Sequence, residues 1–227
     1  MSRVRGFTCA AFLLLLILVT FLPPAHASGQ SIPINGRYST LTIPIYIPAY
    51  PKWAHDVVLN ATIAWNKAQA WYSQSNASAP TYRFVETSDG TATAIVTFDM
   101  PKAYAGIAVG WTDYKFARGS RTSITSTQTY LDPTVFSQGQ ESNMTARHLA
   151  FWLALHELGR ILGLGSVLDG QDIMEPRATP ERASQIPRLS TLDLYAIQVL
   201  ALGATPPFVT LPGGVPNELT LATFFLP

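Results

Sequence analysis

Apolar residues recur at intervals of three and four from about residue 51 to residue 75, which predicts a long helix with one buried face. A second helical stretch, residues 143 to 164, is apolar on most sides, and Gly163 and Gly165 are placed to end it. A third begins near residue 189, where Ser190 and Asp193 have the spacing of a capping box, and it ends at Gly203. The apolar positions of the first helix are Ala54, Val57, Val58, Ala61, Trp65, Ala68 and Tyr72.

Alternating apolar and polar positions predict strands between these helices. One covers residues 41 to 48, and Pro44 inside it favours an edge strand or an interrupted one. Others cover residues 81 to 86, 91 to 100 and 121 to 133. Residues 103 to 120 are rich in glycine and aromatic residues, which fits either a loop or a short edge strand. The order of helices and strands indicates an α+β fold without internal repeats.

The first 27 residues have the layout of a secretory signal peptide. Arg3 and Arg5 precede an apolar run over residues 12 to 22, and the segment ends Ala25-His26-Ala27. We therefore expect cleavage after Ala27 and a location outside the cell or on its surface, with an uncleaved membrane anchor as the alternative. The chain then divides into a signal peptide (1–27), one domain (28–203) and a tail rich in proline and glycine (204–227).

Charge and cysteine content narrow the classes of function. The chain has 15 Lys and Arg against 14 Asp and Glu, and loss of the leader removes two of the arginines. This near-neutral balance argues against nucleic acid or anionic lipid as a partner. Cys9, the only cysteine, lies in the leader, so the exported chain has no disulfide or thiol chemistry. Sequons at Asn60, Asn76 and Asn143 give weak support for a glycoprotein.

The stretch "ALHELGRILGLGSVLDGQDIMEP" (residues 154–176) carries the candidate chemistry. In the pattern His-Glu-x-x-His, two imidazoles one helical turn apart bind a single zinc ion, and the glutamate activates a water bound to the metal. His156 and Glu157 match the start of this pattern, but Arg160 stands where the second histidine is expected.

With its flanking elements, this stretch resembles the matrixin-type metzincins, zinc peptidases whose pattern is H-E-x-x-H-x-x-G-x-x-H followed by a methionine turn. The likeness covers most of the mature chain and matches the pattern at His156, Glu157, Gly163 and Met174. It implies a metzincin-like domain with a twisted mixed β-sheet and long helices, in which the active-site helix ends at Gly163. It also implies zinc as cofactor, His156 as metal ligand, Glu157 as general base, and structural roles for Gly163 and Met174.

The chain departs from that pattern at two of the three metal ligands. Arg160 and Ser166 hold the second and third ligand positions; a guanidinium has no lone pair, and a neutral hydroxyl is a poor zinc ligand. His148 lies about 12 Å from His156 along the helix and cannot share its ion. Asp169 and Asp172, beyond the glycines, could serve as substitute ligands. Ligand chemistry nevertheless argues against tight zinc binding.

Two functions follow from the resemblance and its departures. The favoured one is a catalytically impaired pseudo-peptidase that binds a peptide or protein outside the cell, or acts there as a scaffold. The alternative is an active zinc metalloendopeptidase with an unconventional ligand set, in which Glu157 is the base. At residue level, Glu157 and Arg160 form either an ordinary helical ion pair or a pair in which the cation takes the place of zinc. Trp111, Asp113 and Tyr114 are candidate cleft residues.

Overall fold

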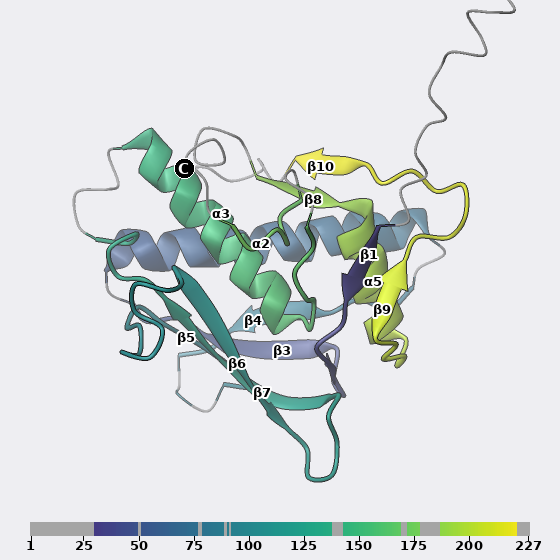
Figure 1. The fold of residues 1–227 in the computed structure, drawn as a ribbon, viewed down its shortest axis with the longest axis horizontal. Helices are drawn as coiled ribbons and strands as arrows, with labels where there is room; N and C mark the ends of the chain where they lie inside the picture. The colour runs from purple at the N-terminus through teal and green to yellow at the C-terminus, as the bar shows by residue number, and fades with distance from the viewer. Residues whose placement is uncertain are drawn as a thin grey trace, which may run out of the picture.

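The computed structural model describes residues 30–49, 51–76, 79–88, 90, 92–137, 143–168, 172–177 and 187–221. The expected signal peptide and Asp169 lie outside these residues. The described part of the chain has an α+β architecture, as the sequence predicts: a mixed, mostly parallel sheet with two long helices packed above it (Figure 1). In this part of the chain, no helix is both long and apolar enough to cross a bilayer.

The main sheet is formed by β2 (Arg37–Tyr38), β3 (Thr42–Tyr46), β4 (Arg83–Glu86), β5 (Ala94–Thr97), β6 (Gly110–Phe116) and β7 (Ser123–Leu131). Its order is β2-β7-β5-β3-β4, and β6 pairs antiparallel with the other side of β7. The remaining pairs are parallel. Residues 103 to 120 therefore supply an edge strand, which was one of the two predicted alternatives.

Of the two alternatives expected for the strand with Pro44, the edge strand is wrong, because β3 pairs with both β4 and β5. The backbone oxygens of Leu41 and Ile45 accept hydrogen bonds from β4, so Pro44, at the opposite parity, directs its nitrogen toward the β5 side. Pairing with β5 begins only at Ile45. The missing N–H thus interrupts no ladder, and an interior strand can accommodate the proline.

Three helices occupy the positions that the apolar periodicity predicts: α2 (Lys52–Ser75), α3 (Met144–Ile161) and α5 (Thr191–Ala201). The helices α2 and α3 cross each other above the sheet (Figure 1). From Ala150 to Gly159, every residue of α3 is buried. The capping box predicted for α5 is confirmed: the Ser190 hydroxyl accepts from the Asp193 N–H, and the Asp193 carboxylate accepts from the Ser190 N–H.

Two side chains in the middle of α2 fix the helix to its neighbours. The indole N–H of Trp65 donates to the backbone oxygen of Leu155 in α3, at 2.9 Å. The side-chain amide of Asn66 makes two 2.9 Å hydrogen bonds with the backbone N–H and C=O of Phe84, on the outer edge of β4. Asn66 thereby occupies hydrogen-bonding groups that an edge strand would otherwise expose.

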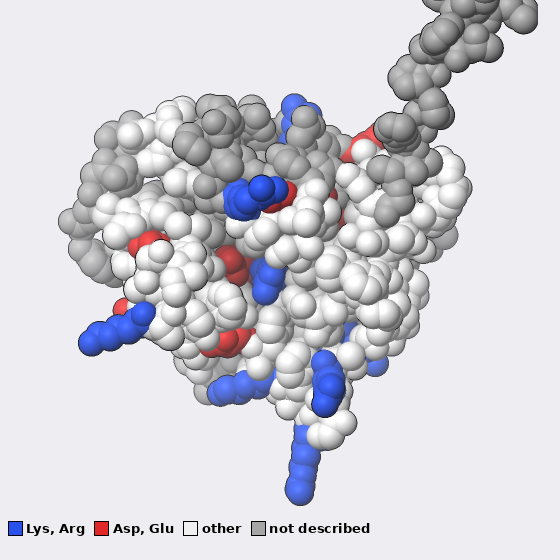
Figure 2. Space-filling model, in the orientation of Figure 1, with Lys and Arg blue, Asp and Glu red and all other residues white. Residues whose placement is uncertain are grey.

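The last two described strands each pair with an earlier strand outside the main sheet. β9 (Phe208–Thr210) pairs with β1 (Ser31–Pro33), and β10 (Leu219–Leu221) pairs with β8 (Arg188–Ser190). Both strands come from the segment that the sequence marks as a tail rich in proline and glycine. Positive and negative side chains are scattered over the described surface in Figure 2, without a continuous basic stripe on that face.

Candidate functional site

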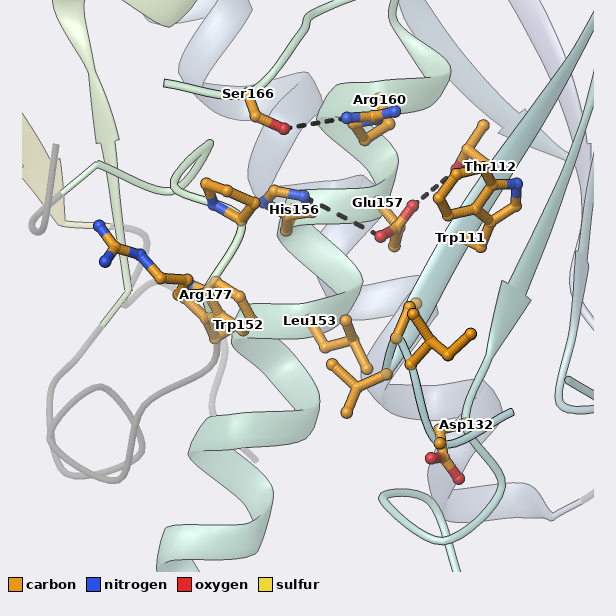
Figure 3. Close-up of a pocket in the computed structure, with 16 residues that line it drawn as sticks. Trp111, Thr112, Asp132, Trp152, Leu153, His156, Glu157, Arg160, Ser166 and Arg177 are labelled. Atoms are coloured by element: carbon orange, nitrogen blue, oxygen red, sulfur yellow. Dashed lines mark hydrogen bonds and ion pairs between the residues drawn. The ribbon is translucent and has the colours of Figure 1, made fainter. Parts of the chain in front are cut away.

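A cleft of about 580 Å³ lies between the edge strand β6 and the helix α3. Figure 3 shows side chains of both elements at this cleft, with Ser166 beside Arg160 and with Arg177 extending outward from the segment beyond the helix. The lining residues are Gly106, Ile107, Ala108, Val109, Gly110, Trp111, Thr112, Asp132, Trp152, Leu153, His156, Glu157, Arg160, Ser166, Pro176 and Arg177. The four positions of the metal-binding pattern, His156, Glu157, Arg160 and Ser166, therefore share one cavity.

His156 is held in a fixed orientation at this cleft. Its Nδ1 donates to the backbone oxygen of Ile173 at 2.8 Å, and its ring stacks on Trp152 with centroids 5.4 Å apart. Because a carbonyl only accepts, Nδ1 carries a hydrogen, which leaves Nε2 as the nitrogen that offers a lone pair when the ring is neutral. Nε2 lies 4.0 Å from Oε1 of Glu157.

Glu157 is a buried acid bonded to the edge strand rather than to its own helix. Its Oε2 accepts from the Thr112 hydroxyl at 2.7 Å, and Thr112 is 2.9 Å from the Thr129 hydroxyl. Burial raises the pKa of Glu157 to about 7, although the Thr112 hydrogen bond and the Arg160 charge oppose the rise. Gly110 makes room for this carboxyl: a Cβ there would lie 2.7 Å from Oε1. The cavity therefore contains a buried acid that ionises less readily than an exposed one.

Arg160 and Ser166 contact each other directly. Nη1 of Arg160 donates to Oγ of Ser166 at 3.0 Å, and both side chains are half-buried (Figure 3). Within the described residues, no carboxylate lies at ion-pair distance from this guanidinium. The direct ion pair expected between Glu157 and Arg160 is not formed, because Glu157 accepts from Thr112 and Arg160 donates to Ser166, although the Arg160 charge still lowers the pKa of Glu157.

The turn after α3 brings Ser166 to Arg160. Gly163 has φ +98°, and a Cβ there would lie 2.0 Å from the backbone oxygen of Gly36, so only glycine fits. Asn35 braces the same turn by donating to the backbone oxygen of Leu164 at 2.9 Å. Tyr114 donates to the backbone oxygen of Arg160 at 2.8 Å and holds the last turn of the helix.

Met174 lies beneath the helix, in contact with Gly159. A Cβ on Gly159 would lie 2.5 Å from the Met174 sulfur. The Met174 turn is closed by Asp172, whose Oδ1 accepts from the Met174 N–H at 2.7 Å. The buried carboxyl of Asp172 also interacts with that of Asp193, and burial together with this neighbour raises the pKa of Asp193 well above its usual range. This carboxyl pair was not foreseen, because its members are 21 positions apart.

The described residues of this cavity do not fit a zinc ion. Of the three positions that the resemblance assigns to metal ligands, only His156 has a nitrogen lone pair to offer, and the guanidinium at 160 places a cation in the same cavity. Asp172 is directed into its own turn and is not among the cleft-lining residues. Across the described residues, no three His, Cys, Asp or Glu side chains are grouped closely enough to hold a metal.

The predicted cleft residues divide between two places. Trp111 lines the cleft, whereas Asp113 and Tyr114 do not: Asp113 accepts from the Trp111 indole N–H at 2.7 Å, and Tyr114 packs below the helix end. Sequence reasoning missed Thr112 and Gly110. Their only signal is the alternation along residues 110 to 116, which sets Thr112 on a buried face but does not identify its partner.

The sequence matches no family model, and no curated protein matches it. Among solved structures, one similar chain belongs to the GM1-bound form of the ECX AB5 holotoxin. The alignment covers 76% of this chain and 88% of that chain, with 13% identity and a TM-score of 0.43. A likeness at that score does not establish a shared fold.

Proposed function

We propose that this chain is an exported protein of metzincin type that has lost its zinc site and binds extended peptides in the cleft between β6 and α3. The single observation that carries the proposal is the hydrogen bond between Arg160 and Ser166. The resemblance assigns two zinc ligands to these positions, and here the two side chains satisfy each other instead. The cleft retains its lining residues while the metal chemistry is lost.

The open edge of β6 supports a peptide as the ligand. The backbone oxygen of Val109 accepts from Asp132, at the end of β7, so the odd-numbered residues at the start of β6 face β7. The N–H and C=O groups of Gly110 and Thr112 then point away from β7, and in the described part of the chain β6 has no second strand partner. An extended peptide can add to such an edge as a further strand.

The two edges of the sheet are treated differently, which strengthens this interpretation. Asn66 covers the outer edge of β4 with two hydrogen bonds. The outer edge of β6 instead borders a cavity with Trp111 and Leu153 in its walls, where apolar side chains of a bound strand can be buried. Natural sheets rarely leave an edge unprotected without a reason.

One observation favours the alternative, an active zinc metalloendopeptidase. His156 has the hydrogen bond from Nδ1 to a backbone carbonyl that orients metal-binding histidines, and Glu157 shares its cavity. In that case the zinc would need ligands besides those described above. Measurement of metal content separates the two functions.

The test combines metal analysis, cleavage and peptide binding on the same purified protein. We expect far less than one zinc per chain after equilibration with excess zinc, and no cleavage of casein. One zinc per chain, with cleavage abolished by a chelator and by Glu157→Ala, would establish the peptidase instead. We also expect the protein to capture members of a random octapeptide pool, and N-methylation of alternate backbone amides to abolish their binding. If no peptide is captured, the binding role is rejected.

A further inference from the structure

Among the described residues, no carboxylate forms an ion pair with Arg160 in the cleft. Its guanidinium is half-buried and donates to the neutral Ser166 hydroxyl. The nearby acid, Glu157, accepts from the Thr112 hydroxyl of β6 instead. A partly buried cation is stabilised by an anionic partner far more than by a hydroxyl. The cleft therefore favours a ligand that carries a negative charge to Arg160.

The other charged side chains that line the cleft do not pair with Arg160. Asp132 lies at the opposite end of the close-up view from Arg160 (Figure 3). Arg177 is exposed and already paired with Glu175, at 2.7 Å. Among the described lining residues, Arg160 is the cation without an ion-pair partner, and Asp132 and Glu157 are acids of the same cavity. The site therefore suits a single negative charge better than the double charge of a phosphate group.

A carboxylate is the anion whose shape matches this site. A guanidinium presents parallel N–H donors that bind a carboxylate in a bidentate manner. The Ser166 hydroxyl, while it accepts from Arg160, keeps its own proton to donate. The cavity wall also includes the apolar side chains of Leu153 and Trp111, which favour apolar side chains in the chain that bears the carboxylate.

We propose that Arg160 and Ser166 bind the C-terminal carboxylate of an extended peptide whose preceding residues pair with the open edge of β6. This inference rests on the proposed peptide-binding function and adds the part of the ligand that is recognised. The cation at the former ligand position thus has a role of its own: it selects chain ends over internal segments of a protein. Apolar residues next to the chain end are expected, since they face Trp111 and Leu153.

The experiment compares two pools of random octapeptides, biotinylated at the N-terminus, that differ only in a C-terminal carboxylate or carboxamide. We expect capture of the free acids to exceed that of the amides by about tenfold or more, because loss of one partner of a desolvated charge pair has at least this effect. The best acid peptide is then titrated, as acid and as amide, against wild type, Arg160→Gln and Ser166→Ala. Arg118→Gln, an exposed arginine between β6 and β7, is the charge-matched control.

Arg160→Gln should lower the affinity for the acid peptide to that for the amide peptide and leave the affinity for the amide unchanged. Arg118→Gln should leave both affinities unchanged. If Arg160→Gln does not fold, Arg160→Lys, which keeps the charge and loses the bidentate fork, should reduce the preference for the acid. Equal capture of the two pools overturns the carboxylate inference and leaves the peptide-binding function standing. A preference for acids that survives both Arg160 variants also overturns it. Capture of neither pool rejects the proposed function itself.

Discussion

Replacement of Glu157 by glutamine tests whether burial keeps this acid protonated. The folded chain raises the pKa of Glu157 to about 7 from an ordinary value of 4.5. Below pH 4.5 the carboxyl is protonated in both states, and the stability it contributes is fully present. As the pH rises above 4.5, the carboxyl ionises in the unfolded chain before it ionises in the folded one, and this favours unfolding. The stability that the carboxyl contributes therefore falls until the pH has passed the folded pKa. The difference between the folded and unfolded pKa values corresponds to about 3 kcal/mol in the free energy of unfolding.

Glutamine keeps the shape of the side chain, and its amide oxygen can still accept from Thr112, but it does not ionise. The free energy of unfolding of Glu157→Gln, measured with urea, should therefore rise relative to wild type by about 3 kcal/mol between pH 4.5 and pH 8. Asp193, whose pKa is also raised, contributes equally to both proteins and cancels in the difference. The exposed Glu218→Gln serves as the control and should follow wild type. Parallel curves for Glu157→Gln and wild type would refute the reasoning.

Three further substitutions test the packing around the site, each by denaturant unfolding. Gly159→Ala should lower the free energy of unfolding by about 1–3 kcal/mol although helices favour alanine, since the added Cβ would lie 2.5 Å from the Met174 sulfur. A higher free energy of unfolding would contradict that contact. Gly163→Ala should lose about 3 kcal/mol or more, because its φ is +98° and the Gly36 oxygen is 2.0 Å from the added atom; unchanged stability would show that the turn can relax. Ser190→Ala should lower the free energy of unfolding by about 1–2 kcal/mol, because it removes the N-terminal cap of α5. An unchanged free energy of unfolding would mean that the hydrogen bond between this hydroxyl and the backbone is not needed.

The helices and the glycine break were predicted well because their signals are local. The apolar periodicity of α2, the capping box at Ser190 and the end of α3 at Gly163 each depend on residues that lie close together in the sequence. The edge position expected for β3 was wrong for the opposite reason. Whether a strand containing Pro44 lies inside a sheet depends on where its neighbours begin to pair, and those neighbours come from distant parts of the chain.

For the site, the sequence by itself determined which residues are present and what they cannot do. Arg160 and Ser166 stand where the resemblance to zinc peptidases would place metal ligands, and a guanidinium has no lone pair to give. Only the tertiary structure decided which partners these side chains have. Arg160 turned to Ser166, and Glu157 reached Thr112, 45 positions earlier in the chain. Hydrogen-bond partners and pKa values depend on distances and burial in the folded chain, which residue spacing along one helix does not specify.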